Sequence, residues 1–119
     1  DLHGADLYSA NLMDVILAGA DLSGVNLKRS ILYAANLEGA NLAGATFKHA
    51  ILEGANLRSA NLSGASLIGV NLERADLVGA NLERADLDSA SLAGARYDTT
   101  TRWPDGFDPQ AAGAISMTD

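Results

Sequence analysis

Large apolar residues recur at every fifth position of this chain, from Leu2 to Tyr97, without a single slip. All of these positions hold Leu except those of Phe47 and Tyr97. The residue two places earlier is nearly always small, and the residue between the two is mostly Asp or Asn. An α-helix would carry such residues around its cylinder, and a straight strand would alternate their faces. A common interior therefore requires the backbone to turn a corner once per repeat, so the chain must coil.

Each repeat divides into a short extended side and a corner. The large apolar residue and the small residue two places before it have strand spacing, so both are predicted to point inward and the residue between them outward. The other two positions form the corner. Gly often fills the second corner position, as a type II turn with positive φ would require. We expect a different turn type where a larger residue takes the place of Gly, as at Arg29, His49, Arg74 and Arg84.

The repeat motif A(D/N)LxG resembles that of the pentapeptide-repeat family over residues 1–97. The resemblance implies an all-β fold, a right-handed quadrilateral parallel β-helix with about five coils of about twenty residues. The residues alone leave the number of sides open, because the Gly positions suit a three-sided coil about as well as a four-sided one. Departures from the motif are mild: Ile replaces the outward Asp or Asn three times and Ser replaces the inward Ala once, at Ile16, Ile31, Ile51 and Ser30.

The repeats stop after Tyr97, which divides the chain into two parts. We expect a β-helix over residues 1–97 and a C-terminal capping segment with a tail over residues 98–119. The end of a solenoid exposes its last apolar layer, which must be covered. Trp103 and Phe107 are the expected lid, since they are the large aromatic residues of this segment.

The capping segment carries a helix signal and resembles the C-terminal segment of family members from cyanobacteria. Asp108 followed by Pro109 predicts a short helical turn that ends at Gly113, and residues 115–119 are expected to fray. The first coil has no comparable cap. Because Asp1 lies in the middle of a repeat, we expect a processed chain or part of a longer array.

Composition and charge narrow the function classes. The 119 residues carry a net charge of −7 and no Cys, so neither a disulfide framework nor a thiolate metal site is available. The negative charge disfavours direct binding to nucleic acid. No run of about eighteen apolar residues exists, so we expect no membrane partner. A cytoplasmic location is expected, with the thylakoid lumen or the periplasm as alternatives if a leader has been removed.

Candidate chemistry is scarce along the repeats. His3 and His49 lie in different parts of the array, and no nucleophile, base or metal cage gathers on one face. The outward columns of Asp and Asn are expected to be solvated or bonded along the ladder, not to hold a metal. We therefore predict no catalytic residue, no cofactor, no metal site and no enzymatic activity.

Stacking every twentieth residue gathers two candidate surfaces. A basic patch is predicted at the corners of adjacent coils and consists of Lys28, Arg29, Lys48 and His49. An outward apolar patch is predicted on the next side, where the family has polar residues, and consists of Met13, Ile31, Tyr33 and Ile51. A plainer interpretation remains for both, because corner residues vary freely and an exposed Ile needs no partner.

Two function classes remain. The first is a non-catalytic structural or protein–protein interaction module that presents a rigid β-helical surface to an unknown protein. A second copy of the chain is one candidate partner, through the uncapped first coil or the Ile31 and Ile51 side. The alternative, a DNA-mimicking modulator of DNA gyrase, follows from the resemblance, since some family members act on gyrase in this way. Glu53 above Glu73 favours mimicry, whereas the bases spread among the acids argue against it. The fold alone does not decide between them.

Overall fold

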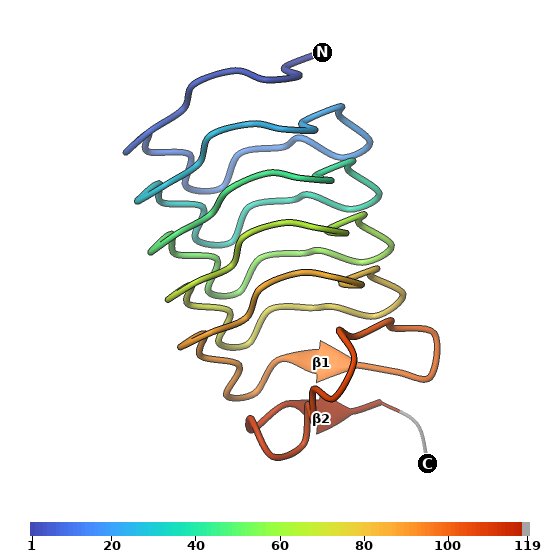
Figure 1. The fold of residues 1–119 in the computed structure, drawn as a ribbon. Helices are drawn as coiled ribbons and strands as arrows, with labels where there is room; N and C mark the ends of the chain where they lie inside the picture. The colour runs from blue at the N-terminus through green and yellow to red at the C-terminus, as the bar shows by residue number, and fades with distance from the viewer. Residues whose placement is uncertain (118–119) are drawn as a thin grey trace.

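A computed structural model describes residues 1–117 as a stack of coils, and the first and last residues of this range lie at opposite ends of the stack (Figure 1). Successive coils are joined by parallel bridges between residues twenty positions apart, beginning with Asp6 and Asn26. This spacing gives each coil four sides of one repeat each, which excludes the three-sided alternative. The molecule measures 38 × 25 × 23 Å. Within residues 1–117, no helix is long and apolar enough to cross a membrane.

The interior is filled by the residues that the five-residue period predicts to point inward. Leu62 and Ala60 are 0% and 1% exposed, whereas Leu2 in the first coil is 37% exposed. Each fully buried Leu contributes about 1.5–3 kcal/mol through removal from water. Ser30, which replaces an inward Ala, is also buried, and its hydroxyl donates to the carbonyl of Leu27 at 2.6 Å. That hydrogen bond removes the penalty of burying a polar group.

Hydrogen bonds explain why the outward position favours Asp and Asn. In a regular repeat, four of the five backbone N–H groups donate to backbone carbonyls, mostly of neighbouring coils. The remaining N–H, at the first corner residue, donates to the side chain of the outward Asp or Asn, as Arg58 does to Asn56 Oδ1 at 3.1 Å. Every outward Asp and Asn accepts this bond. Each is therefore part of the corner as well as of the surface.

The expectation of a different turn type at the larger corner residues is wrong. Arg29, His49, Arg74 and Arg84 have φ values of 59° to 62°, in the same left-handed region as the corner glycines. The reason is the set of backbone hydrogen bonds between adjacent coils. The N–H of His49, for example, donates to the carbonyl of Ile68 in the next coil at 2.9 Å. Stacking thus imposes the same corner at every coil, against a strain of about 1–2 kcal/mol for each non-Gly residue.

The two assigned strands close the C-terminal end of the stack. β1 (Arg96–Tyr97) and β2 (Ile115–Ser116) pair in parallel, with Arg96 opposite Ile115. The expectation that residues 115–119 fray is therefore wrong for Ile115 and Ser116, while residues 118–119 lie outside the described part of the chain. The unpaired edge of the last coil explains the difference, because Ile115 N–H bonds to Ala95 at 2.7 Å.

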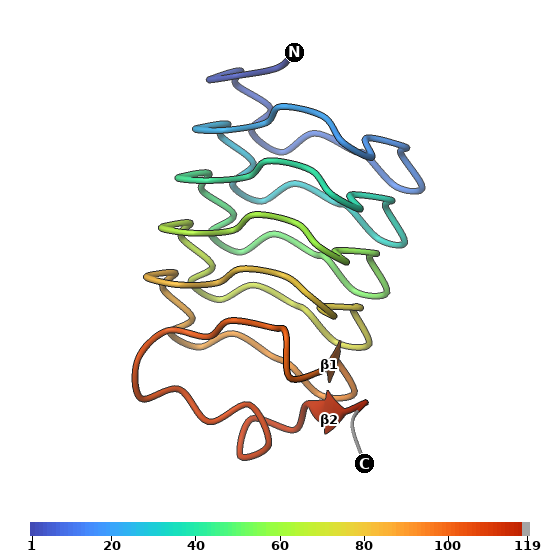
Figure 2. The same cartoon turned by 90° about the vertical axis from the view of Figure 1, so that its right-hand side faces the viewer.

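The segment after β1 continues the ladder before it leaves the coil. Arg102 bridges Asn81, one residue later than the regular spacing, so this corner contains one additional residue. Trp103 then packs edge-on against Tyr97 with ring centroids 5.6 Å apart, and Phe107 stacks on Trp103 at 5.2 Å. Figure 2 shows this segment running below the last coil. The domain boundary at residue 97 and the role of the two aromatic residues as a lid remain predictions.

Turns occupy residues 109–113, where the sequence predicts a helical turn. The N–H of Ala112 donates to the carbonyls of Asp108 and Pro109 at 3.3 and 3.1 Å, and Gly113 N–H donates to Gln110 at 3.0 Å. Oδ1 of Asp108 accepts the N–H groups of the residues that follow Pro109. Asp108 thus makes the bonds of an N-cap, although no helix is formed in this segment.

Candidate functional site

The structure brings the four residues of the predicted apolar patch together on adjacent coils. Ile31 and Ile51 bridge one another in parallel, so they are direct neighbours across the stack. The corner of Met13 lies against the corner of Tyr33, since the N–H of Asp14 donates to the Tyr33 carbonyl at 2.9 Å. Met13, Tyr33 and Ile51 are 51%, 45% and 38% exposed. An outward apolar surface therefore lies on one side of the early coils.

Ile31 and Ile51 also remove a hydrogen bond from the corners beside them. At an outward Asn, the side-chain oxygen would accept the N–H of the residue two places later. Within residues 1–117, the N–H groups of Tyr33 and Glu53 have no acceptor, because Ile31 and Ile51 stand in that place. The two Ile side chains are therefore not explained by the needs of the coil.

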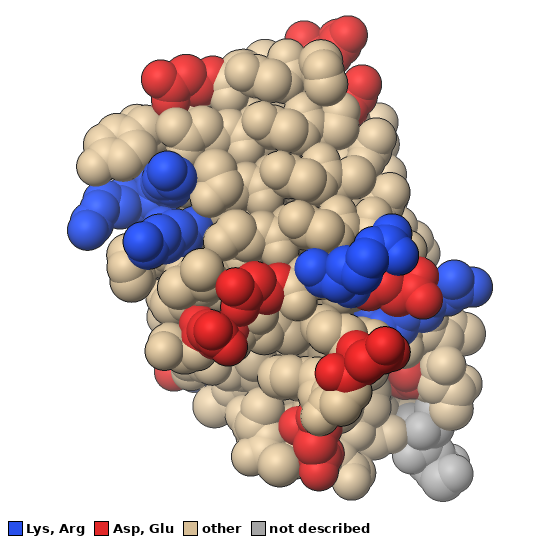
Figure 3. Space-filling model, in the orientation of Figure 1, with Lys and Arg blue, Asp and Glu red and all other residues tan. Residues whose placement is uncertain are grey.

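The residues of the predicted basic patch line one hollow. Lys28 and Lys48 are first corner residues on adjacent coils, and Arg29 and His49 are the left-handed residues that follow them. Together with Tyr8 they line a hollow of about 230 Å³. Figure 3 shows a group of Lys and Arg side chains with no acidic side chain among them, and a second group mixed with Asp and Glu.

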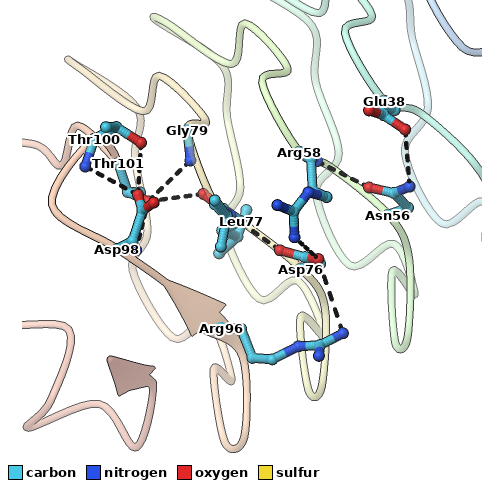
Figure 4. A network of polar contacts seen from close by, with 11 residues as sticks. Glu38, Asn56, Arg58, Asp76, Leu77, Gly79, Arg96, Asp98, Thr100 and Thr101 are labelled. Carbon is cyan, nitrogen blue, oxygen red and sulfur yellow. Dashed lines mark hydrogen bonds and ion pairs between the residues drawn. The ribbon is translucent and has the colours of Figure 1, made fainter. Parts of the chain in front are cut away.

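Around Asp76, positive and negative side chains compensate one another (Figure 4). Arg58 Nη1 donates to Asp76 Oδ2 at 2.9 Å, and Arg96 Nη2 lies 3.8 Å from the same oxygen. The hydrogen bond and the charge of Asp76 raise the pKa of the Arg58 guanidinium above its usual value. Farther up the same side, Asn56 Nδ2 donates to Glu38 at 3.4 Å. The charges on this side are therefore used within the fold.

Asp98 and two Thr residues form a second polar cluster, at the corner with the additional residue (Figure 4). The Thr100 hydroxyl donates to Asp98 Oδ1 at 2.6 Å and is the main cause of a lowered pKa at Asp98. The Thr101 hydroxyl, buried in the stack, donates to the Leu77 carbonyl at 2.9 Å. These bonds satisfy the polar groups of the irregular corner.

Three carboxylates of the later coils, those of Glu53, Asp76 and Glu83, each have an arginine within 4 Å. Glu53 pairs with Arg74, and Glu83 lies 3.6 Å from Arg102. Glu73, which stands next to Glu53 in the same corner column, accepts the hydroxyl of Ser91 at 2.8 Å. The column thus presents carboxylates with local partners and not a continuous row of free negative charge.

Neither His belongs to a cluster that suggests catalysis or metal binding. His3 Nδ1 lies 2.7 Å from the hydroxyl of Ser23, and the ring of His49 lies over Gly69 in the next coil. Within residues 1–117, no group of three His, Cys, Asp or Glu side chains could hold a metal ion. The two His residues are thus placed separately, as their positions in the repeats predict.

The comparison with known families decides the identity of the repeats. The family model described as pentapeptide repeats matches with eight copies over residues 1–32, 30–67 and 65–96. The chain is a pentapeptide-repeat protein. Pentapeptide-repeat proteins form right-handed quadrilateral β-helices and are generally structural modules without enzymatic activity. No curated protein matches the sequence.

Several solved pentapeptide-repeat structures are similar to this chain. A pentapeptide-repeat protein (Rfr23) from the cyanobacterium Cyanothece 51142 is 42% identical over 75% of this chain, with a TM-score of 0.52. The chain covers 64% of that protein, less than two thirds of its length. A pentapeptide-repeat protein from the Arabidopsis thaliana thylakoid lumen is 33% identical, with coverages of 80% and 66% and a TM-score of 0.47. QnrB1, a plasmid-mediated fluoroquinolone resistance protein, is 20% identical, with coverages of 95% and 73% and a TM-score of 0.59, and shows the fold alone.

The composition of the repeats did not predict the ion pairs around Asp76. The signal was present, because Arg58 and Arg96 stand eighteen and twenty residues from Asp76, close to the length of one coil. Opposite charges at coil spacing indicate neighbours on adjacent coils. The same test applied to Lys28 and Lys48 finds like charges.

Proposed function

We propose that this chain is a non-catalytic protein–protein interaction module, and that the apolar patch of Met13, Ile31, Tyr33 and Ile51 is the surface it presents. A stack of about five coils, with Trp103 and Phe107 as its lid, supplies a rigid support. The observation that carries the proposal is the pair Ile31 and Ile51, which are bridged on adjacent coils at outward positions, with Ile51 exposed and Ile31 half-buried. They replace polar residues that would have completed the corner hydrogen bonds.

The position of the patch separates this proposal from a purely structural role. Ile31 and Ile51 lie in the early coils, whereas the C-terminal segment covers the opposite end of the stack (Figure 1). Within residues 1–117, the C-terminal segment therefore lies at the other end of the stack from the patch and does not explain its apolar character. Burial of such side chains at an interface yields about 25 cal/mol per Å² of apolar surface. A second copy of the chain or another protein would supply the covering surface.

Mimicry of DNA, the other candidate, has less support from the charges. A duplex mimic needs rows of free negative charge, but Glu53 and Asp76 are paired with arginines from adjacent coils. The basic patch interrupts the acidic surface further. The interaction module is therefore the function that we place first.

The test is the double replacement Ile31→Asn with Ile51→Asn. The two Asn side chains should accept the N–H groups of Tyr33 and Glu53, so thermal stability is expected to stay unchanged or to rise. Self-association in sedimentation velocity, and capture of partners from a native lysate, should both become weaker than for the parent protein.

A matched control is Ile16→Asn. Ile16 is also an outward Ile, 77% exposed, but its bridge partner is Asn36 and not another Ile. This replacement should leave association at the parent level. Association that persists in the double variant, together with lower stability, would show that the patch packs for the fold and would overturn the proposal.

A further inference from the structure

The hollow lined by the basic patch and Tyr8, called the groove below, is shaped by the stacking of three coils. The N–H of Ser9 donates to the Lys28 carbonyl, and the N–H of Arg29 donates to the Lys48 carbonyl, each at 2.9 Å. The corners of Tyr8, Lys28 and Lys48 therefore lie in one column at the strand spacing of about 4.8 Å. The hollow of about 230 Å³ between these corners has room for one small group and not for a long segment of chain.

The cations in this groove lack the partners that other cations of the molecule have. Arg58, Arg74 and Arg102 each meet a carboxylate of a neighbouring coil. Among residues 1–117, no carboxylate lies within 4.0 Å of a charged nitrogen of Lys28 or Lys48, or of Arg29 beside them. Like charges on adjacent coils repel one another, and an anion between them would relieve that repulsion.

His49 lies beside the groove because its ring packs over Gly69. Its left-handed backbone, with φ of 60°, turns the ring toward Gly69 in the next coil. A Cβ at position 69 would overlap the imidazole, so the absence of a side chain there gives the ring its place. The imidazole is thus positioned by packing, next to the two Lys corners.

We propose that this groove binds a phosphate-class dianion, either free phosphate or the phosphate of a small ester. Lys and Arg side chains offer only donors, and an Arg guanidinium matches two phosphate oxygens at once. Three cations around one small hollow match the charge of a dianion better than that of a single carboxylate. Tyr8, 54% exposed at the edge of the groove, adds a hydroxyl donor and an apolar ring. The site is distinct from the apolar patch and goes beyond the proposed interaction function.

The test is a titration of the 15N-labelled protein, followed by amide chemical shifts, with sodium phosphate against sodium chloride at equal ionic strength. At about pH 7.5 phosphate is mostly dianionic. We expect saturable shifts confined to the corners of Tyr8, Lys28 and Lys48. Lys28→Ala with Lys48→Ala should weaken binding by roughly tenfold or more. Ala18 and Ala43 occupy the same corner place in other repeats, so the fold accepts Ala there.

A matched pair of Arg variants separates the site from general charge. Arg29 and Arg84 are both exposed left-handed corner residues, with φ of 59° and 62°, and Ala34 occupies such a corner with φ of 58°. Arg29→Ala should weaken phosphate binding, and Arg84→Ala should bind as the parent does. Shifts that match those of chloride, or that persist in the double Lys variant, would overturn the proposal.

Two further arms identify the source of the dianion and keep the proposal independent of the apolar patch. Titration with O-phosphoserine should give the same shifts if esters are accepted, whereas binding of inorganic phosphate alone would assign the groove to the free ion. Acetate, a monoanion, should bind at least about tenfold more weakly, and equal binding of acetate would overturn the dianion assignment. Ile31→Asn with Ile51→Asn should leave phosphate binding unchanged, so failure of either proposal is visible without the other.

Discussion

Two corner columns on opposite sides of the four-sided coil differ in how their charged side chains are paired. The corner column that includes Arg58 lies half a coil from the column that includes Lys48. Arg58 shares Asp76 with Arg96, so charges of both signs meet within 4 Å. At the other corner, Lys28 and Lys48 stand side by side without a carboxylate among the described residues.

The difference shows which charges the fold itself uses. Both corners have the same backbone, since Ser59 and His49 have φ of 59° and 60° and each donates its N–H to the next coil. The coil would form equally well with compensated charges at both corners. Side chains that are compensated stabilise the stack, while side chains left without partners are available for a ligand.

The largest expected effect on stability comes from disrupting the apolar core that supports both corners. Leu62 is 0% exposed at the centre of the stack, so Leu62→Arg would bury an unpaired charge among leucines. We expect a loss of more than about 4 kcal/mol in the free energy of unfolding, enough to unfold many domains. Circular dichroism during thermal and denaturant unfolding measures the effect.

Ser63→Arg is the control for this prediction, one residue away. Ser63 is a first corner residue like Arg58, so the longer side chain should extend into solvent and change the free energy of unfolding by about 0.5 kcal/mol or less. Equal stability of the two Arg variants would contradict the assignment of inward and outward positions.

The five-residue period was sufficient to predict most of the fold. The period requires a corner in every repeat, because Leu57 and Leu62 can share one interior only if the chain turns between them. It also separates the inward Leu from the outward Asn, and the structure confirms both assignments. Adjacent positions for Ile31 and Ile51 then followed from the twenty-residue coil that the family resemblance implied.

The remaining features depend on contacts between coils, which a local pattern does not contain. The period sets the length of a side but not the angle at the corner, so three or four sides remained open until the bridges were known. The conformation of His49 is imposed by its bond to Ile68 in the next coil and not by its own preference. β2 forms because the last coil offers an unpaired edge.

A smaller effect is expected when the compensated corner loses its charge. Asp76→Asn keeps an oxygen for the N–H of Val78 but removes the negative charge that Arg58 and Arg96 share. Hydrogen bonds to charged groups contribute more than neutral ones, but Arg58 is half exposed, so we expect a loss of about 1 kcal/mol in unfolding free energy.

The matched control is Asp86→Asn, at an outward position that makes the same corner bond and, among residues 1–117, takes part in no ion pair. Its unfolding free energy should stay within about 0.5 kcal/mol of the parent value. If Asp76→Asn were as stable as Asp86→Asn in urea unfolding, the charges of the Arg58 corner would contribute nothing, and the contrast between the two corners would be one of geometry alone.

The smallest expected effect concerns Asp98, which lies in the same corner column as Arg58. The Thr100 hydroxyl, bonded at 2.6 Å, is the main reason that the pKa of Asp98 is lowered. A carboxyl with a lowered folded pKa adds stability above its ordinary pKa of about 3.9, and this stability is lost as the pH falls through the folded value. Thr100→Ala should raise the Asp98 pKa toward the ordinary value, as followed by NMR titration of the carboxyl carbon, and should reduce the dependence of stability on pH in that acidic range.

The internal control is Asp21, whose pKa is lowered mainly by the hydroxyl of Ser23 at a distant corner and which should titrate identically in both proteins. An unchanged Asp98 titration would mean that its backbone bonds alone hold the charged form.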